Sequence, residues 1–581
     1  MSATSAGAIF ARMTADGDLM LAQLDRWAAE TPDKVFLHYG EDGVRLTFAE
    51  VAAHADRLAA GLAGQGIGKG DRVAVLTRNS LVAALSLFGI FRAGAVYAPI
   101  NFNLMGGLLA YQLSDAAPAL LITDPSFLPA LAPIRDEIRI PALALHHPAP
   151  GDHDFEPAPE IPAGLPAPLD LAELAAPGRP VPRVEVGPFD PAAIIYTSGT
   201  TGPAKGVLLG HRWINQYSFF GRPLANADDA IYCDLPMYHV AGAFWLLGVA
   251  TWSGQTIGIW DKFSPARFWD RIAECGATSA TLLDVMIPRL MSAPERPDDR
   301  DNTLMRVHMQ PFNANHHAFA RRFGIDIVTV GFGQTESGAV FAGVIDEFPE
   351  GQGTPAAFWR GMSKADILAA ARDLGRVIFD GREDLPKGLM GAINPLYELG
   401  VLDETDAPVA PGEVGQLCLR PRVPGMILQG YINKPEATLK VLSNCWFHTG
   451  DAVRCVDEAR GLHVFVDRMG GFFRVRGENV SSFEVETALA RHPAVRAAAA
   501  IPLPAAEGDE DDIAAFVELE DGAALTVEEL AAHAAAEMPK YMRPRHLRIL
   551  DALPVTPTSK IEKYKLRAAL LAELDAEKAP A

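Results

Sequence analysis

Apolar side chains recur in two alternating patterns along the first part of the chain. Residues 48–62 (FAEVAAHADRLAAGL) place them three and four positions apart, which predicts an amphipathic helix. Residues 72–76 (RVAVL) form a short apolar run that is typical of a buried strand. A second helix is predicted at 80–91, and strands are predicted at 95–99 and 120–124. This alternation of strands and helices predicts an α/β fold with a mostly parallel sheet.

The alternation is interrupted at residues 144–190. Proline, alanine and acidic residues dominate this stretch (HHPAPGDHDFEPAPEIPAGLPAPLD), which is typical of an extended surface connection without a core of its own. The alternation then resumes, and a helix at 483–491, a strand at 513–518 and a helix that begins at Val527 indicate a separate small unit. We therefore expect a large N-terminal domain of layered α/β subdomains at 1–466 and a small α+β C-terminal domain at 467–581.

A second irregular region, residues 344–390, separates two better-defined motifs. Within it, residues 363–372 (SKADILAAAR) predict a helix with Ser363 as the N-cap and Asp366 three residues further on. Because the surroundings of this helix look inserted, we interpret the region as a surface decoration rather than a functional lid.

Composition and charge narrow the range of partners. The 581 residues are 49% hydrophobic, which excludes general disorder, and the net charge is −21. An acidic surface repels phosphate backbones, so nucleic acid is not expected as a partner. The most apolar stretches, 81–91 and 240–252, are shorter than the ~20 residues of a membrane-spanning helix, so no transmembrane segment is expected. Five cysteines without C-x-x-C spacing, and a start without a signal-peptide pattern, favour a reducing, cytoplasmic location.

The most informative segment is 194–207 (IIYTSGTTGPAKGV), where an apolar strand runs into glycines, hydroxyl side chains and a lysine. Glycines let successive backbone N–H groups point inward as an anion-binding nest, and Lys205 supplies positive charge for a polyphosphate. A Walker A loop is disfavoured, because Ala204 and Gly206 flank the lysine where that pattern requires Gly and Ser or Thr. The candidate phosphate-binding residues are Thr197, Ser198, Gly199, Thr200, Thr201, Gly202 and Lys205.

This segment resembles the phosphate loop of the adenylate-forming superfamily, which contains acyl-CoA synthetases, adenylation domains and luciferases. Further segments resemble the motifs of that superfamily: 331–336 (GFGQTE), 447–451 (FHTGD), 467–481 (DRMGGFFRVRGENVS) and 554–563 (PVTPTSKIEK). Residues 263–278, 430–451 and 476–486 look closest to the branch of crotonobetaine/carnitine–CoA ligases and fatty-acid-transport-type acyl-CoA synthetases. The resemblance covers nearly the whole chain.

The resemblance implies a nucleotide site along GFGQTE. Phe332 would flank the adenine, Gly333 belongs to the same cofactor-binding segment, and Thr335 would contact a phosphate. Glu336 would help to hold Mg²⁺, since a hard cation prefers carboxylate oxygens beside phosphate oxygens. Residues 312–315 (FNAN) stand where the superfamily has Gly-Gly-Ala-Pro, so the adenine contacts differ in detail.

The later motifs imply contacts to the ribose and to CoA. Asp451 would accept hydrogen bonds from the ribose hydroxyls, a natural task for an ionised carboxylate. Arg468 would be the second ribose contact, at the expected boundary between the domains. Gly477 would let the pantetheine arm of CoA pass close to the backbone.

Lys560 falls on the catalytic lysine of the superfamily, although Ser559 replaces the usual glycine before it. It would bridge the attacking carboxylate and the α-phosphate of ATP. His239, in PMYHVAG, would have a supporting role beside the acyl pocket. In such enzymes the small C-terminal domain moves between the two half-reactions.

The resemblance therefore implies an enzyme that activates a small carboxylic acid with ATP and Mg²⁺ and transfers the acyl group to CoA. A carrier-protein-loading adenylation enzyme, a luciferase-like enzyme and a non-catalytic nucleotide-binding scaffold remain as alternatives. Neither the acid nor the oligomeric state follows from the sequence.

Overall fold

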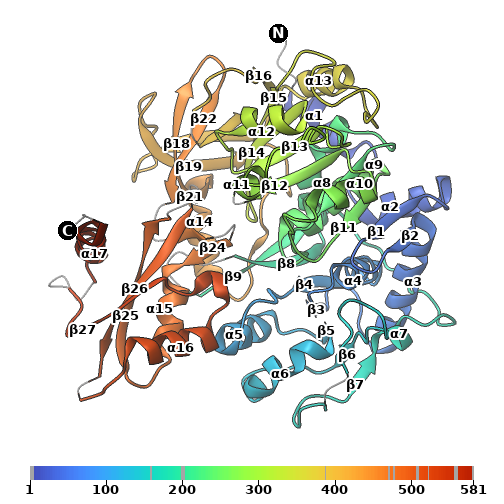
Figure 1. The fold of residues 1–581 in the computed structure, drawn as a ribbon. Helices are drawn as coiled ribbons and strands as arrows, with labels where there is room; N and C mark the ends of the chain where they lie inside the picture. The colour runs from blue at the N-terminus through green and yellow to red at the C-terminus, as the bar shows by residue number, and fades with distance from the viewer. Residues whose placement is uncertain are drawn as a thin grey trace.

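The computed structural model describes residues 5–157, 160–197, 203–284, 286–386, 388–468, 472–475, 478–505, 510–520, 522–554 and 561–578. Two large sheets with surrounding helices form the N-terminal body, and a smaller unit of strands and helices follows (Figure 1). No helix within these ranges combines the length and the apolar composition that crossing a membrane requires.

The first sheet has eight strands in the described part of the chain. In spatial order they are β20 (Gly430–Tyr431), β9 (Lys205–Gly210), β8 (Pro191–Thr197), β4 (Val96–Pro99), β3 (Arg72–Leu76), β5 (Leu120–Thr123), β6 (Leu143–Leu145) and β7 (Pro168–Asp170). From β8 to β7 all neighbours are parallel, whereas β9 and β20 are antiparallel. All residues of β4, β5 and β6 are buried, as expected for strands covered on both faces. The predicted α/β fold with a mostly parallel sheet is confirmed here.

The second sheet has 14 strands in the same described ranges. In spatial order they are β2 (Val44–Thr47), β1 (Val35–Tyr39), β11 (Thr256–Ile259), β10 (Ala230–Cys233), β12 (Ser279–Leu283), β13 (Arg306–Gln310), β14 (Ile327–Gln334), β15 (Gly338–Asp346), β17 (Leu389–Ile393), β22 (Leu462–Arg468), β21 (Phe447–Asp457), β19 (Val414–Pro421) and β18 (Tyr397–Leu402), with β16 (Val377–Asp380) also on β15. Neighbours from β1 to β14 are parallel, and those from β14 to β18 are antiparallel. The change of direction therefore falls at β14.

A continuous hydrophobic core joins the two sheets. Helices α3 (Phe48–Gly64) and α4 (Ser80–Arg92) form at the predicted positions. Phe48 of α3 stacks on Phe36 of β1 with 4.5 Å between the ring centroids, and Phe88 of α4 meets the same ring edge-on at 5.9 Å. Fully buried aromatic side chains of this size contribute strongly to stability, so these contacts fix the first sheet against the second.

Further helices cover the sheets or connect their strands. They are α1 (Ala6–Thr14), α2 (Met20–Glu30), α5 (Gly106–Ala116), α6 (Leu128–Leu131), α7 (Leu171–Leu174), α8 (His211–Phe219), the π-helical segment η4 (Ala241–Leu246), α9 (Leu247–Ser253), α10 (Phe268–Cys275), α11 (Met286–Met291), α12 (His316–Phe323), α13 (Lys364–Asp373) and α14 (Pro435–Val441).

The C-terminal unit has its own hydrophobic core. It consists of the hairpin β23 (Phe472–Val475) and β24 (Glu478–Ser481), the sheet β25 (Val495–Pro504), β26 (Asp511–Leu519) and β27 (His546–Leu550), and the helices α15 (Ser482–Ala490), α16 (Val527–Glu537) and α17 (Lys563–Lys578). Val485 of α15, Ile513 of β26 and Leu530 of α16 are buried together. The unit packs beside α5 of the N-terminal body (Figure 1). The predicted helix at 483–491 and strand at 513–518 are confirmed to within a few residues.

The predicted surface connection at 144–190 is wrong for part of its length. Residues 168–170 form β7 at the edge of the first sheet, and Leu171 and Leu174 of α7 are buried. A Cβ added at Gly61 of α3 would meet the carbonyl oxygen of Leu174 at 1.9 Å, which shows how closely the two helices approach. The sequence pattern missed this because a strand and a helix this short carry almost no periodic signal.

The interpretation of residues 344–390 as a surface decoration is also wrong. Helix α13 forms as predicted, and the Ser363 hydroxyl accepts a hydrogen bond from the Asp366 amide. However, Ile367 and Ala371 on its inner face are fully buried in a hydrophobic cluster. The strand β16 that follows pairs in parallel with β15, so the region is built into the second sheet.

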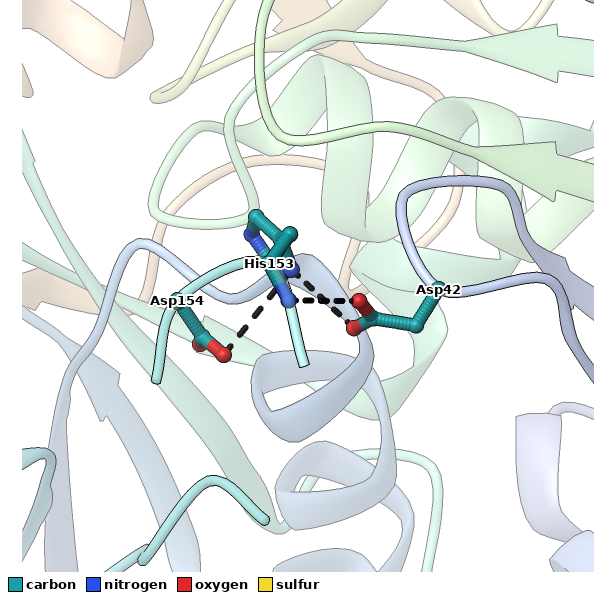
Figure 2. Close-up of side chains that lie close together, drawn as sticks. All are labelled: Asp42, His153 and Asp154. Carbon is teal, nitrogen blue, oxygen red and sulfur yellow. Dashed lines mark hydrogen bonds and ion pairs between the residues drawn. The ribbon is translucent and has the colours of Figure 1, made fainter. Parts of the chain in front are cut away.

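His153 ties the Pro-rich connection to two other segments. Its Nδ1 lies 3.0 Å from Asp42 in the β1–β2 turn and 3.8 Å from Asp154 (Figure 2). Its Nε2 lies 2.9 Å from Asp261, which follows β11. Burial alone would lower the pKa of His153, but the hydrogen bond to Asp42 and the charges of Asp261 and Asp154 outweigh burial and raise it. A charged imidazolium therefore joins the connection to the second sheet.

We expect the stabilisation from His153 to depend on pH. A histidine whose pKa is raised by folding contributes fully below its ordinary value of 6.5 and loses its contribution as the pH rises through the folded pKa. His153→Gln should therefore lower the thermal midpoint of unfolding below pH 6.5 and have little effect in alkaline buffer. Because partly exposed ion pairs stabilise by about 1 kcal/mol or less, the shift should be on the order of 1–2 °C.

The matched control is His147→Gln, which changes an exposed histidine of the same connection. It should not reproduce the pH dependence in the same thermal unfolding series. An equal shift for His153→Gln at every pH would contradict the ion pair.

Candidate active site

A cavity of about 1180 Å³ opens where the two sheets and the C-terminal hairpin meet. Thr197 and Lys205 of the first sheet line it, together with Glu336 in the turn after β14. Phe473 and Glu478 of the β23–β24 hairpin line it from the C-terminal side. The cavity lies along β14, where the second sheet changes from parallel to antiparallel pairing. Concave, largely apolar cavities with a few polar groups are typical ligand sites.

Glu336 is held between the two sheets. Its Oε1 accepts hydrogen bonds from the hydroxyls of Thr197 at 3.2 Å and Tyr431 at 3.0 Å, which belong to β8 and β20. Hydrogen bonds to an ionised carboxylate are stronger than neutral ones, so this pair fixes the orientation of the carboxylate. Thr197 and Lys205 are direct partners in the β8–β9 register. The lysine therefore lies beside Thr197, shortly after the Gly-rich stretch of the sequence.

Lys205 is a partly desolvated cation. Its Nζ lies 4.9 Å from the centroid of the Tyr431 ring. Burial lowers the pKa of Lys205, although the charge of Glu336 acts in the opposite direction. Within the described residues, no carboxylate forms an ion pair with it. Such a cation at the mouth of a Gly-rich loop is suited to bind an anionic ligand.

The backbone of β14 passes close to β15 along GFGQTE. A Cβ added at Gly333 would lie 2.4 Å from the carbonyl oxygen of Gly338, so only glycine fits at this position. The ring of Phe332 lies nearly parallel to that of Phe465 on β22, with 6.4 Å between their centroids, and both rings line the cavity. They offer a flat apolar surface for an aromatic base. Thr335, which is buried, lines the cavity next to Glu336.

Asp451 lies in β21, next to Thr449 and Gly450, which line the cavity. Its carboxylate is fully buried and accepts a hydrogen bond from Gln334, whose side-chain amide also donates to the carbonyl of Thr449 at 3.1 Å. In the β21–β22 register Asp451 stands opposite Arg468. The two residues that the sequence assigns to one ligand group are therefore neighbours on adjacent strands.

His239 lies on the rim of the cavity, in the turn that leads into η4. Its Nδ1 accepts a hydrogen bond from the amide of Ala241 at 3.4 Å. The neighbouring Tyr238 donates its hydroxyl to Glu478 of the hairpin at 2.6 Å and accepts a hydrogen bond from Asn103 at 3.3 Å. Burial and the charge of Glu478 raise the pKa of Tyr238, so the phenol keeps its proton and remains a donor. This hydrogen bond connects the N-terminal body to the C-terminal unit.

The structure brings together Thr197, Lys205, His239, Phe332, Gly333, Thr335 and Glu336 around the cavity, and places Asp451 directly behind Gln334. Arg468 is described only through its backbone in β22. Other predicted site residues lie outside the described residues: Ser198, Gly199, Thr200, Thr201, Gly202, Gly477 and Lys560.

Four residues that form hydrogen bonds at the site were not predicted from the sequence: Gln334, Tyr238, Glu478 and Tyr431. Gln334 and Tyr238 each stand beside a predicted site residue, and Glu478 follows Gly477. Their proximity to these motifs could have identified them as candidates. Tyr431 had no such signal, because it lies far along the chain from Thr197 and Glu336. Only the pairing of β20 with β9 brings it to the site.

Comparison with known proteins matches both parts of the chain to family models. The family model described as AMP-binding enzyme matches residues 24–432, and the model of the AMP-binding enzyme C-terminal domain matches residues 484–560. A curated relative named crotonobetaine/carnitine–CoA ligase, from Shigella sonnei, is 29% identical over 515 residues, which cover 86% of this chain and 89% of the relative. A relative of the same name from Escherichia coli is 28% identical over 536 residues, which cover 90% and 93% of the two chains.

Solved structures share the fold. The o-succinylbenzoate CoA synthetase of Bacillus subtilis superposes with a TM-score of 0.72 at 21% identity and covers 94% of this chain and 97% of its own. The amide bond synthetase McbA of Marinactinospora thermotolerans superposes with a TM-score of 0.70 at 23% identity and covers 95% and 99% of the two chains.

The packing at Gly333 leads to a stability prediction. Gly333→Ala places a methyl group against the Gly338 carbonyl, and the fixed strand pairing cannot yield without cost. We expect a loss of about 1–3 kcal/mol in the free energy of unfolding, measured by urea denaturation. Gly64→Ala at the end of α3 is the control, because its added Cβ meets nothing within 4 Å and should leave stability unchanged or slightly raised. Equal midpoints for Gly333→Ala and wild type would contradict the close approach.

Proposed function

Because the chain belongs to the AMP-binding enzyme family, as its motifs predicted, we propose that it is an ATP-dependent acid–CoA ligase. It converts a carboxylic acid and ATP into acyl-AMP and pyrophosphate, and then transfers the acyl group to the thiol of CoA. The observation that supports this most directly is the continuous cavity, which joins the cluster of Thr197, Lys205 and Glu336 to an apolar pocket and reaches the C-terminal hairpin. Such a cavity can hold a nucleotide and an acid together and admit a thiol from the hairpin side.

In this proposal the nucleotide lies along the polar side of the cavity. The loop at 198–202 and Lys205 bind the phosphates, and Thr335 adds a donor. The adenine stacks on Phe332, whose ring is backed by Phe465. Asp451 and Arg468, which face each other across β21 and β22, bind the ribose hydroxyls.

The surroundings of Glu336 fit Mg²⁺. A carboxylate that lines the cavity and is oriented by the hydroxyls of Thr197 and Tyr431, with no ion pair to a cation among the described residues, is a suitable hard donor. Glu336 would hold the ion, and the ion when bound supplies positive charge that offsets the phosphate charge.

The first half-reaction brings two anions together. A carboxylate oxygen of the acid attacks the α-phosphorus, and the bond between this phosphorus and the pyrophosphate oxygen breaks. The protein contributes by positioning the reactants and by neutralising charge. Lys205 acts on the phosphates, and Lys560, from the C-terminal unit, bridges the attacking carboxylate and the α-phosphate.

In the second half-reaction the CoA thiol loses its proton and attacks the acyl carbonyl carbon, and the bond to AMP breaks. We propose that the C-terminal domain at 467–581 moves between the steps and withdraws Lys560. The contact between Tyr238 and Glu478 keeps the hairpin over the cavity rim beside His239. The resemblance of the segment around Gly477 to the superfamily supports a role of this glycine in leaving room for the pantetheine arm.

Loss of the Glu336 carboxylate should impair the first half-reaction. Glu336→Ala removes the negative charge that favours Mg²⁺, so pyrophosphate release should fall by about a hundredfold or more. Glu336→Gln keeps the size of the side chain and an acceptor for Thr197 and Tyr431, which separates the effect of charge from that of packing. Initial rates over a Mg²⁺ titration are the measurement. Midpoints equal to wild type in both variants would remove Glu336 from the metal site.

The two-step scheme itself is tested with Lys560→Ala. Wild type should release pyrophosphate only when ATP and a suitable acid are both present, and should form a thioester when CoA is added. Lys560→Ala should lose pyrophosphate release by about a hundredfold or more, because a charge-assisted contact in the transition state is removed. The same variant, given synthetic acyl-AMP and CoA, should form the thioester at a rate near that of wild type.

The outcomes separate the alternatives. Pyrophosphate release without thioester formation would favour a ligase with another acceptor. No pyrophosphate release with any acid would leave a nucleotide-binding scaffold. If Lys560→Ala lost both half-reactions equally, the withdrawal of this lysine between the steps would be contradicted.

A further inference from the structure

Beyond the nucleotide side, the cavity continues as an apolar pocket between α8, η4 and the second sheet. Tyr217, Phe220 and Trp245 supply aromatic walls. The rings of Tyr217 and Trp245 lie edge to face with 6.0 Å between their centroids. Leu224 and Val249 complete the lining with aliphatic side chains. This part of the cavity is shaped for the hydrocarbon portion of an acid.

Arg376 stands at the end of this pocket. It directly precedes β16, in the region 344–390, and lines the cavity. Its Nη2 donates to the carbonyl oxygen of Phe220 at 3.1 Å, and its guanidinium lies 4.8 Å from the centroid of the Phe220 ring. Its Nε is buried without a hydrogen-bond acceptor. Throughout the described residues, no carboxylate is paired with this arginine.

Another arginine of the cavity wall is placed differently. Arg306 donates to the carbonyl of Leu224; burial lowers the pKa of Arg306, and the charge of Asp229 acts in the opposite direction. Among the residues that the structure describes, no carboxylate acts on Arg376 in this way. An uncompensated cation in a protein interior is unfavourable, so a site that retains one is suited to receive an anion from a ligand.

His308 adds a polar group beside Arg376 without adding charge. Its Nδ1 lies 3.0 Å from the hydroxyl of Thr329, and its ring lies 5.5 Å from that of Trp245. Burial lowers the pKa of His308 to about 4, and the positive charge of Arg376 adds to this effect. Burial also lowers the pKa of Arg376, to about 9, so the arginine is charged at neutral pH and the histidine is not.

The position of Arg376 separates it from the nucleotide. His308 pairs with Thr329 near the start of β14, whereas Gln334, which contacts Asp451, ends the same strand. Five residues of extended strand span roughly 16 Å. The cation therefore lies at the far end of the cavity from the ribose contact and is not placed to bind ATP phosphates.

We propose that Arg376 is a specificity-determining residue that binds a second carboxylate of the acid, so that the substrates are dicarboxylic acids with an apolar spacer. This inference rests on the acid–CoA ligase function proposed above. The guanidinium fork matches a carboxylate in a bidentate arrangement, and the ion pair supplies the missing countercharge. The aromatic walls of Tyr217, Phe220 and Trp245 enclose the spacer between the two carboxylates. A trimethylammonium acid would instead place a cation against Arg376.

The test compares acids in matched pairs. Pyrophosphate release is measured with unbranched monocarboxylic acids from hexanoate to decanoate and with the α,ω-dicarboxylic acids of the same lengths. Phenylpropanoate and its para-carboxy derivative form an aromatic pair, and carnitine is included as a cationic acid. For at least one spacer, wild type should favour the dicarboxylic member in kcat/KM by about tenfold or more.

Variants of Arg376 test whether this arginine causes the preference for dicarboxylic acids. Arg376→Ala should lower kcat/KM for the preferred dicarboxylic acid by about 10- to 100-fold and leave the matched monocarboxylic acid unchanged. Arg376→Lys keeps the charge but loses the fork, so its value should fall between wild type and Arg376→Ala. Arg382→Ala is the control, since this arginine lies in the same region with 77% of its side chain exposed. It should behave as wild type.

Calorimetric titration with the acids measures binding independently of catalysis. If no acid supports pyrophosphate release, the proposed function fails. Even then, tighter binding of a dicarboxylic acid to wild type than to Arg376→Ala would support the role of Arg376. Equal binding to both proteins would overturn it. A preference of wild type for monocarboxylic acids or carnitine, or an equal loss for all acids in Arg376→Ala, would also overturn it.

Discussion

The site depends on one carboxylate that two sheets hold from opposite sides. Glu336 lies in the turn between β14 and β15 of the second sheet, and the hydroxyls that orient it come from Thr197 and Tyr431 of the first sheet. The backbone supports the same junction, since the amide of Leu428 donates to the carbonyl of Glu336 at 2.7 Å. Any shift of one sheet against the other would break hydrogen bonds to a charged group, which cost more to lose than neutral ones. The same hydrogen bonds therefore fix both the relative position of the sheets and the geometry of the site.

A desolvated cation lies at each end of the cavity. Lys205, at the end beside Glu336, has a pKa lowered by burial, and Arg376, at the other end, has its pKa lowered by the same cause. The wall between them is aromatic and aliphatic. In our proposals the phosphates of the nucleotide lie at Lys205 and the second carboxylate of the acid lies at Arg376.

The C-terminal unit is attached by contacts that suit movement. Tyr238 donates to Glu478, and Asn101 donates to Tyr541 at 3.0 Å. Arg491 lies 3.6 Å from Glu137 in a partly exposed ion pair. The partly exposed ion pair can be exchanged for water at low cost, whereas the hydrophobic core within the unit cannot. This difference allows the unit to move as a body, as the proposed two-step reaction requires.

By itself, the sequence determined the α/β alternation, the smaller C-terminal unit and the motif residues Thr197, Lys205, Thr335 and Glu336. Short-range patterns suffice for these, because periodicity reflects burial and a Gly-rich loop with a lysine requires only neighbouring residues. Only the tertiary structure decided that Tyr431 orients Glu336, that Tyr238 meets Glu478, and that the region 344–390 carries a cavity arginine. Each of these contacts joins segments far apart in the chain, and their side chains carry no local signal for it. The pairing of β20 with β9 places Tyr431, the packing of the C-terminal unit beside the N-terminal body places Glu478, and the pairing of β16 with β15 places Arg376.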